Sequence, residues 1–322
     1  MATYSGTSRD LVRQTLHHDS PDRVPLYLFN RDFERADIVA AHLVTFPKSE
    51  SGGTDAWGQV WKRLDETMGQ PDEPVVHSAP EAERLEAPSV DSTAIRRAIA
   101  EVREDHPDVY LLGSLAITGF NRAAFLRGFD AALEDMLLAP ESFIQLLETV
   151  CEYEETIVAA MAGSGVDAVA LWDDWGMQGG LVTSPALFRE LVLPRYRRQF
   201  AMIHELGMEI YFHSCGNIEE IAVDLVEAGV DLLNISQPNC NDLGAIGEYL
   251  RGRTTFVVPI SYQTTSISGT PDEIHVEAKR MFDHLAGPRG GFIGYVEEYT
   301  VMGMSERNYQ ACIGAFRSLP GW

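Results

Sequence analysis

Apolar positions along the chain recur in short runs, separated by longer segments of helical period. Seven runs are rich in β-branched and aromatic residues, as is typical of strands buried on both faces of a parallel sheet. They cover residues 24–29, 109–114, 167–172, 208–213, 231–236, 255–260 and 291–296. Because segments of helical period separate these runs, the pattern predicts an α/β fold with a parallel sheet.

Two of the intervening segments carry a clear helix start. Ser184 and Thr270 each precede a proline, so that a capping side chain stands before a proline at the first helical position. Each segment then keeps a helical period until it reaches a glycine, which is a common residue just past a helix end. The sequence therefore predicts a helix directly after each of these two starts.

A closed (β/α)8 TIM barrel fits this alternation better than a doubly wound sheet does. No Gly-x-Gly-x-x-Gly motif follows any run, and 322 residues is a length that α/β barrels reach as one domain. We therefore expect residues 1–322 to form a single barrel domain, although the pattern does not locate the eighth strand. The segment at about 45–90 is polar and rich in loop-forming residues, and we expect it to be an excursion over the barrel mouth.

Charge and composition exclude several classes of partner. The chain has 48 acidic and 25 basic residues and a formal net charge of −23, whereas a phosphate backbone is bound by clustered Lys and Arg. We therefore expect no nucleic acid and no membrane as partner. The acidic surface serves solubility or docks a basic partner.

The compartment follows from what the chain lacks. No stretch reaches the roughly 18 apolar residues of a membrane span, and the N-terminal residues have no apolar core of a signal peptide. We therefore expect a cytoplasmic protein. The cysteines show no disulfide spacing and are expected to be thiols or ligands: Cys151, Cys215, Cys240 and Cys312.

Polar residues that end an apolar run are the candidates for chemistry, because the active site of a barrel forms at the carboxyl ends of its strands. Four segments qualify: 173–176, 213–216, 234–238 and 297–299. Within the second, His213 and Cys215 are two residues apart, so their side chains share a face of the strand and can converge on a cation such as zinc. A buried histidine beside an inert thiol would give the same pattern.

The acidic pairs at the other strand ends are governed by the same alternation. Asp173 and Asp174 are adjacent, so only one can face the pocket while its neighbour points elsewhere or caps the following turn. We expect at least one of them to orient substrate or to handle a proton. Glu297 and Glu298 alternate in the same way.

Uncharged polar residues complete the candidate site. They follow strand ends, or in one case a stretch that borders the expected cavity, and they suit hydrogen bonding to a neutral polar ligand. We expect these residues to bind substrate: Asn121, Asn234, Gln237, Tyr262 and Gln263.

Residues 212–239, with 173–176, 269–274 and 53–69, resemble the uroporphyrinogen decarboxylase superfamily, specifically its cobalamin-dependent methyltransferase branch. The resemblance spans nearly the whole chain and implies a TIM barrel of the uroporphyrinogen decarboxylase type. In zinc-bearing members of that branch, a His-x-Cys pair and a cysteine that follows a Gly-Gly strand hold the metal. This sequence has the pair at His213 and Cys215 and the glycines at 290–291, but Glu298 stands where the cysteine would be.

The departure at Glu298 leaves two alternatives. Glu298 replaces the thiolate as a ligand, which gives a harder zinc site that suits an oxygen-containing substrate. Otherwise the metal is lost and Glu298 acts as a general acid or base. Cys240 and Cys312 are weaker candidates for the third ligand, since Cys312 lies in a helical pattern that would bury its thiol.

The resemblance implies a methyltransferase that moves a methyl group between a small methylated substrate and the cobalt of a corrinoid. An aryl or alkyl methyl ether is the first candidate for the substrate. The chain lacks an Asp-x-His-x-x-Gly corrinoid motif, so cobalamin is expected on a separate corrinoid protein. The direction of transfer and the oligomeric state, a homodimer included, stay open.

The alternative function is decarboxylation of uroporphyrinogen without a metal. Family members bind the carboxylates of that substrate with an arginine-containing segment after the first strand. Here Arg31 and Arg35 are interspersed with Asp32 and Glu34, and the whole chain is acidic. This composition disfavours a polyanionic substrate.

Overall fold

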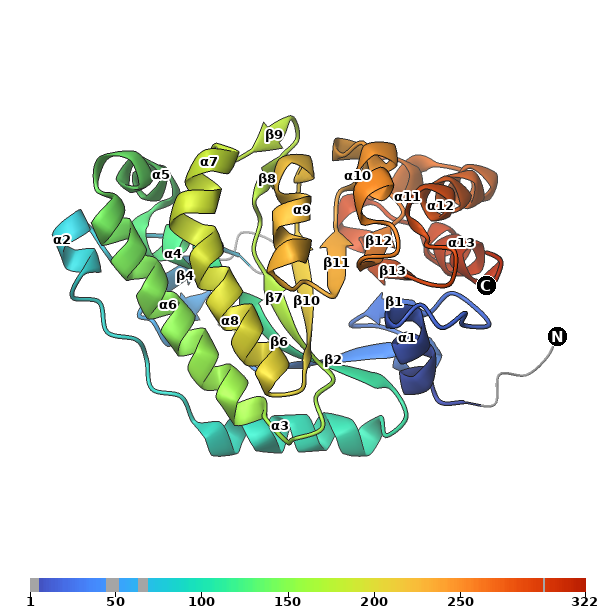
Figure 1. The fold of residues 1–322 in the computed structure, drawn as a ribbon, viewed down its shortest axis with the longest axis horizontal. Coiled ribbons are helices and arrows are strands. Elements are labelled where there is room, and N and C mark those ends of the chain that lie inside the picture. Colours follow the sequence, from blue (N-terminus) through green and yellow to red (C-terminus); the bar gives the residue numbers. More distant parts are fainter. Residues whose placement is uncertain (1–5, 45–51, 63–68, 298) are drawn as a thin grey trace.

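The computed structural model describes residues 6–44, 52–62, 69–297 and 299–322. Eight parallel strands close into a barrel in the order β1-β13-β12-β11-β10-β7-β6-β2, with helices packed around the outside (Figure 1). The strands are β1 (Leu26–Phe29), β2 (Ile38–His42), β6 (Tyr110–Ile117), β7 (Ala168–Trp172), β10 (Glu209–Ser214), β11 (Leu232–Ile235), β12 (Thr255–Pro259) and β13 (Phe292–Glu297). The predicted TIM barrel is confirmed, and each of the seven predicted runs overlaps a barrel strand.

The eighth strand is β2, which the sequence pattern did not locate. It follows β1 after a single 3-10 turn, η1 (Phe33–Arg35), and pairs with β6 through five residues in register. The expected rhythm placed a full helix between consecutive strands, and this connection has none. The sequence pattern therefore gave no signal that separates β2 from β1.

The helices begin where the sequence places capping residues. Ser184 Oγ accepts a hydrogen bond from Leu187 N, and Thr270 forms a capping box with Glu273. No helix in the described part of the chain has the length and apolar character needed to cross a membrane. The α-helices are α1 (Ser8–Leu16), α2 (Ala79–Ala82), α3 (Ser92–Asp105), α4 (Gly119–Arg127), α5 (Phe129–Leu138), α6 (Pro140–Met161), α7 (Pro185–Leu187), α8 (Leu193–Glu205), α9 (Glu219–Ala228), α10 (Leu243–Leu250), α11 (Thr265–Ser268), α12 (Pro271–Leu285) and α13 (Glu306–Arg317).

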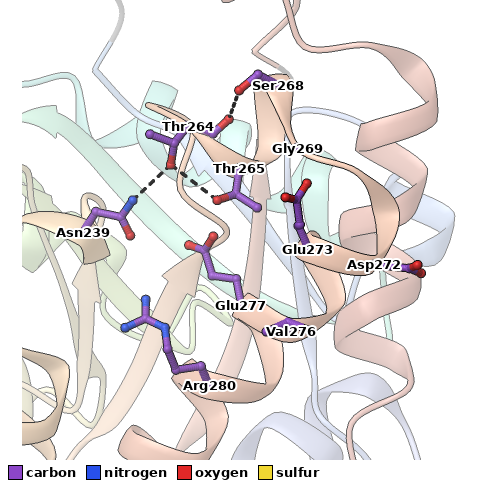
Figure 2. A pocket seen from close by; sticks show the side chains of 10 residues that line it. All are labelled: Asn239, Thr264, Thr265, Ser268, Gly269, Asp272, Glu273, Val276, Glu277 and Arg280. Carbon is purple, nitrogen blue, oxygen red and sulfur yellow. Dashed lines mark hydrogen bonds between the residues drawn. The ribbon is translucent and has the colours of Figure 1, made fainter.

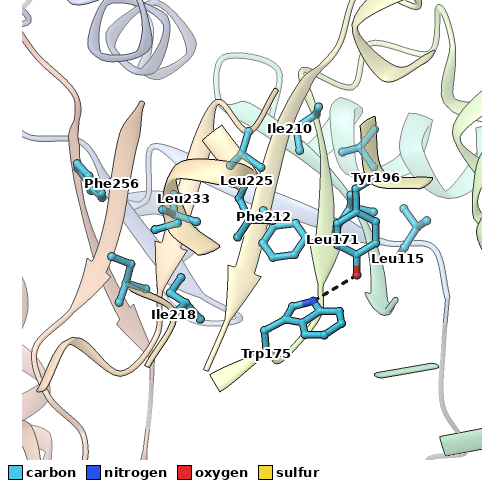
Figure 3. Packing of buried hydrophobic residues seen from close by; sticks show 14 of the residues in the cluster. Leu115, Leu171, Trp175, Tyr196, Ile210, Phe212, Ile218, Leu225, Leu233 and Phe256 are labelled. Carbon is cyan, nitrogen blue, oxygen red and sulfur yellow. Dashed lines mark hydrogen bonds between the residues drawn. The ribbon is translucent and has the colours of Figure 1, made fainter. Parts of the chain in front are cut away.

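The core has two layers, one inside the barrel and one between the strands and the helices. Tyr27, Tyr211 and Tyr295 lie inside the barrel and are at most 1% exposed. Figure 3 shows the outer layer, where Phe212 of β10 packs near Tyr196 of α8. Burial of a large apolar side chain stabilises a fold by about 1.5–3 kcal/mol, so these layers hold the strand ends in place.

The segment expected as an excursion forms a small antiparallel sheet and packs on the helix after β6. Asp55 and Arg122 of α4 form an ion pair at 2.8 Å, with side chains 4% and 3% exposed, and Trp61 packs edge-on against Phe125. Residues 45–51 and 63–68 lie outside the described part of the chain. The strands of the sheet are β3 (Gly53–Thr54), β4 (Val60–Lys62) and β5 (Gln70–Pro71).

Candidate functional site

His213 and Cys215 converge at the carboxyl end of β10. Cys215 Sγ lies 3.6 Å from His213 Nε2, and the His213 side chain is nearly buried while Cys215 is partly exposed. The two side chains therefore lie on the same face of the strand end, as their two-residue spacing predicts. An imidazole nitrogen and a sulfur meet at one point of the barrel mouth.

Asp174 adds a carboxylate oxygen to this pair. It lies in the turn after β7, the strand that pairs with β10, and its Oδ1 is 3.4 Å from His213 Nε2. The same oxygen accepts a hydrogen bond from Cys215 N at 2.7 Å. The ligand atoms of the three residues all lie within 4.8 Å of one another, and we call Asp174, His213 and Cys215 the donor group.

The separations within the donor group fit a tetrahedral zinc site. Zn–N, Zn–S and Zn–O bonds of the usual lengths give tetrahedral edges of about 3.4 Å between nitrogen and oxygen and about 3.6 Å between nitrogen and sulfur. The observed distances from His213 Nε2 are 3.4 Å to Asp174 Oδ1 and 3.6 Å to Cys215 Sγ. The nitrogen, sulfur and oxygen therefore fit a zinc ion at the two separations that involve the His213 nitrogen.

Asn234 of β11 fixes the orientation of the His213 ring. Its side-chain NH2 donates to Val257 O at 2.7 Å, which directs its Oδ1 toward His213 Nδ1 at 2.5 Å. Nδ1 must then carry the proton and donate it, so Nε2 is the nitrogen left for a ligand. Asn234 was expected to bind substrate, but it is 0% exposed with both halves of its amide engaged, which suits it to positioning His213.

Charge around the donor group favours a bound cation or proton. Burial alone would lower the pKa of His213, but the Asp174 carboxylate and the Cys215 sulfur outweigh it, and the pKa is raised. Burial likewise opposes ionisation of Asp174, yet its hydrogen bond with His213 leaves the pKa lowered. A zinc ion would take the place of the proton on His213 Nε2.

Asp173 points away from the donor group and holds the start of α4. Its carboxylate accepts hydrogen bonds from Phe120 N at 3.2 Å, Asn121 N at 2.8 Å, Trp175 Nε1 at 3.0 Å and Tyr196 OH. It is 0% exposed, and burial raises its pKa well above the usual range. The expectation that one aspartate caps a turn while the other faces the pocket matches these positions, so Asp173 is a positioning residue.

Asn121 connects α4 to the donor group. In the amide orientation that gives both of its groups a partner, the Asn121 side chain accepts a hydrogen bond from Asp174 N at 3.0 Å and donates one to Asp174 O at 3.2 Å. Both bonds reach the Asp174 backbone, so Asn121 fixes the direction in which the Asp174 carboxylate leaves the chain. Asn121 was expected to bind substrate, and the structure gives it this positioning contact.

Glu154 of α6 also holds the start of α4. It is almost fully buried and accepts hydrogen bonds from Gly119 N and from Gln199 Nε2, each at 2.8 Å. Burial raises the pKa of Glu154 from 4.5 to about 7. No feature of the sequence marked this glutamate, because its partners lie 35 and 45 residues away.

Glu154→Gln is expected to change how stability depends on pH. Because the folded-state pKa is raised, the stabilising contribution is complete below about pH 4.5 and is lost as the pH rises through about 7, a change of about 3 kcal/mol. Urea unfolding of the wild type and the variant near pH 5 and pH 8 measures it. Relative to the wild type, the variant's free energy of unfolding should rise by about 3 kcal/mol between the lower and the higher pH. An equal pH dependence of the two free energies would contradict the assignment.

The expected substrate residues after β11 lie beside Cys215. Gln237 Oε1 accepts a hydrogen bond from Gly216 N at 2.9 Å, and Cys240 Sγ lies 3.9 Å from the same oxygen. Gln263 is exposed, and its Oε1 lies 3.8 Å from Cys240 Sγ. Gln237 therefore holds the turn after Cys215, and Gln263 lies further out.

Tyr262 and Tyr299 form an aromatic wall near the Cys215 sulfur. Their rings lie 4.5 Å apart, centre to centre, at 30°. Burial, aided by the nearby Cys215 sulfur, raises the pKa of Tyr262. Tyr262 was expected to bind substrate, and it lies where it could do so.

Strand β13 brings Glu297 to the barrel mouth. Its carboxylate accepts hydrogen bonds from Tyr295 OH at 2.7 Å and Tyr299 OH at 3.0 Å. Glu298, expected as a metal ligand or an acid-base group, lies outside the described residues. Cys312 lies on α13, 2% exposed, and burial raises its pKa to about 12, so its thiol is a core group.

A groove of about 600 Å³ lies outside the barrel and includes none of the donor group (Figure 2). Asn239 Nδ2 donates to Thr264 Oγ1 across it at 3.1 Å. Its lining combines hydroxyls, carboxylates and a single arginine, Arg280.

Comparison with known proteins places this architecture in a family. A family model described as uroporphyrinogen decarboxylase (URO-D) matches residues 60–319. The chain belongs to the uroporphyrinogen decarboxylase family. A uroporphyrinogen decarboxylase of Syntrophotalea carbinolica is 25% identical over 232 residues, 68% of this chain and 63% of that protein. One of Nocardia farcinica is 32% identical over 100 residues, 31% of this chain and 27% of that protein, so the chain spans less than two thirds of either relative.

A solved structure shares the fold over nearly its full length. A methyltransferase from Methanosarcina mazei superposes with a TM-score of 0.73 at 16% sequence identity, covering 97% of this chain and 98% of that one. At this identity the similarity describes the fold.

The arginines after β1 are already paired in this member of the uroporphyrinogen decarboxylase family. Arg31 bonds Glu306 at 2.7 Å, and its guanidinium lies 4.3 Å above the Tyr309 ring. Arg35 bonds Asp32 at 3.3 Å. Their own acids and a ring therefore compete with any carboxylated substrate for these two cations.

Proposed function

We propose that this chain is a methyltransferase that moves a methyl group between a small methylated substrate, an aryl or alkyl methyl ether in first place, and the cobalt of a corrinoid on a separate protein. The observation that carries the proposal is the donor group, in which an oxygen and a sulfur lie at zinc-ligand distances from the His213 nitrogen. The fold shared with a methyltransferase is consistent with it.

Methyl ethers are poor methyl donors because the leaving oxygen takes up a negative charge. A zinc ion in the donor group would act as a Lewis acid toward that oxygen. Asp174, His213 and Cys215 would hold it, with Asn234 keeping the imidazole in the required tautomer and Asn121 fixing the Asp174 backbone. The protein therefore supplies a prearranged site, because neighbouring elements anchor the His213 ring and the Asp174 backbone.

Decarboxylation of uroporphyrinogen is the second candidate, since the matched relatives bear that name. It requires cationic groups for a polyanionic substrate. The ion pairs of Arg31 and Arg35 oppose it.

A direct assay separates the two candidates. Zinc-loaded protein is mixed with reduced cobalamin and a methoxylated aromatic compound, and methylcobalamin is followed by its absorbance. In parallel, uroporphyrinogen is supplied and released CO2 is measured. Zinc-dependent methylcobalamin formation without CO2 release is expected, and CO2 release by the metal-free protein would overturn the proposal.

Salt is expected to slow methyl transfer to a corrinoid protein but not to free cobalamin. The chain carries a net charge of −23, so a basic docking surface on the partner would be attracted, and exposed charges are screened within about 8 Å at physiological ionic strength. The rate with protein-bound corrinoid should fall several-fold as salt rises from low to high. Equal salt responses for the two acceptors would show that the acidic surface takes no part in docking.

A further inference from the structure

The barrel mouth has an aromatic floor beside the donor group. Phe29 of β1 and Trp172 of β7 face inward and are partly exposed, with ring centres 5.5 Å apart at 54°. Trp172 lies 4.4 Å from the His213 ring and is held by a hydrogen bond from its Nε1 to Ser114 Oγ at 3.1 Å. A flat ring resting on this floor would therefore lie next to His213.

A hydrogen-bond acceptor adjoins the floor. Glu297 pairs in register with Phe29, and its carboxylate is held by the hydroxyls of Tyr295 and Tyr299. Tyr299 stacks on Tyr262, which completes the wall between Glu297 and Cys215. The carboxylate is fixed in position yet partly exposed, so it can accept one more hydrogen bond.

The charges at the mouth select against anions. Glu297 is an acid beside the floor that is not part of the donor group, and the arginines that follow β1 are engaged with Glu306 and Asp32. A ligand carboxylate would meet like charge at short range, which costs binding energy. An alkylammonium would be attracted, but its leaving group is a neutral amine, which needs no Lewis acid, whereas the donor group suits a leaving oxygen.

We propose that Phe29, Trp172 and Glu297 form a recognition subsite for an uncharged aromatic methyl ether with a free hydroxyl, a methoxyphenol. Its ring lies against Phe29 and Trp172, and its hydroxyl donates to Glu297. The inference rests on the proposed function, since the methoxy group must reach the donor group. It adds that methoxybenzoates and methylated ammonium compounds are poor substrates.

Binding by calorimetry to the zinc-loaded protein, without corrinoid, tests the subsite apart from catalysis. The probes are 2-methoxyphenol, methoxybenzene and 4-methoxybenzoate. Methoxyphenol should bind about 10- to 100-fold more tightly than methoxybenzene, as expected for one hydrogen bond to a charged acceptor. The benzoate should bind more weakly than both. Preference for the benzoate over methoxyphenol would overturn the proposal, as would no binding of any aromatic probe.

Variants assign the preference to residues. Glu297→Gln should reduce methoxyphenol to the affinity of methoxybenzene and improve binding of the benzoate. Trp172→Leu, or Phe29→Leu if the first variant folds poorly, should weaken both neutral aromatics while zinc content stays unchanged. Glu101→Gln, at an exposed α3 position paired with Arg97, is the matched control. An unchanged ratio of the two neutral affinities in Glu297→Gln would remove Glu297 from the subsite.

The two proposals fail in different ways. If the binding preferences appear but no methyl group reaches reduced cobalamin, the subsite stands and the methyltransferase proposal falls. If methyl transfer occurs with methoxybenzoates as readily as with methoxyphenols, the methyltransferase proposal stands and the subsite falls.

Discussion

Replacing His213 or Cys215 with alanine is expected to abolish zinc binding and to lower methyl transfer by at least about 100-fold, while the fold is retained. Loss of a residue that only hydrogen-bonds a metal ligand already costs about 10- to 100-fold, so loss of a ligand itself should cost more. Both side chains lie at the end of β10 and contribute little to the barrel core. Metal analysis, the cobalamin assay and circular dichroism on the same samples measure the three quantities.

Cys240→Ala is the matched control for these variants. Its thiol lies near Gln237 and Gln263 and is not part of the donor group. Zinc content should stay at the wild-type level. A Cys215→Ala protein that keeps both zinc and activity would show that the sulfur is not a ligand.

Asp173→Ala is expected to destabilise the fold by about 3 kcal/mol, whereas Asp174→Asn should cost less than about 1 kcal/mol. Removal of the Asp173 carboxylate leaves two backbone amides, an indole and a phenol without their acceptor, and each unsatisfied buried group costs about 1–3 kcal/mol before water relaxes into the space. Asp174 is partly exposed, and asparagine keeps an oxygen for Cys215 N. Urea unfolding gives both free energies.

For zinc content the order of the two effects is reversed: the Asp174 variant should be affected more than the Asp173 variant. Asp174→Asn should lose most of its zinc because an anionic ligand becomes neutral, and a destabilised but folded Asp173→Ala should keep the larger share. If Asp174→Asn unfolds first and still binds zinc fully, the two roles are reversed.

Much of the fold could be predicted from the sequence because strands and helices carry different periods. The seven apolar runs each overlap a barrel strand, and the capping residues Ser184 and Thr270 precede helices. Strand β2 could not be placed, because only a 3-10 turn separates it from β1. The boundary between consecutive strands was visible only where a helix intervened.

The candidate site was predictable only as far as local geometry reaches. His213 and Cys215 follow from alternation along one strand, but the place of Asp174 beside them depends on the pairing of Trp172 with His213 across β7 and β10. Strand register of that kind is not written in either segment alone. Alternation along the strand end does indicate that Asp174, and not Asp173, lies on the same face as Trp172.

The positioning residues were missed or assigned to substrate for the same reason. Asn234 was identified as a polar strand-end residue, yet its contact with His213 arises between two strands. Glu154 and Tyr196 reach the start of α4 and Asp173 from distant helices. Tertiary packing alone brings these groups together.

Zinc titration of the metal-stripped protein, read by elemental analysis and X-ray absorption, tests the central claim most directly. The account predicts about one zinc per chain, with one sulfur, one imidazole nitrogen and oxygen among its neighbours, and loss of the sulfur contribution in Cys215→Ala. A fully folded protein that binds no zinc, or that binds it without sulfur, would contradict the account.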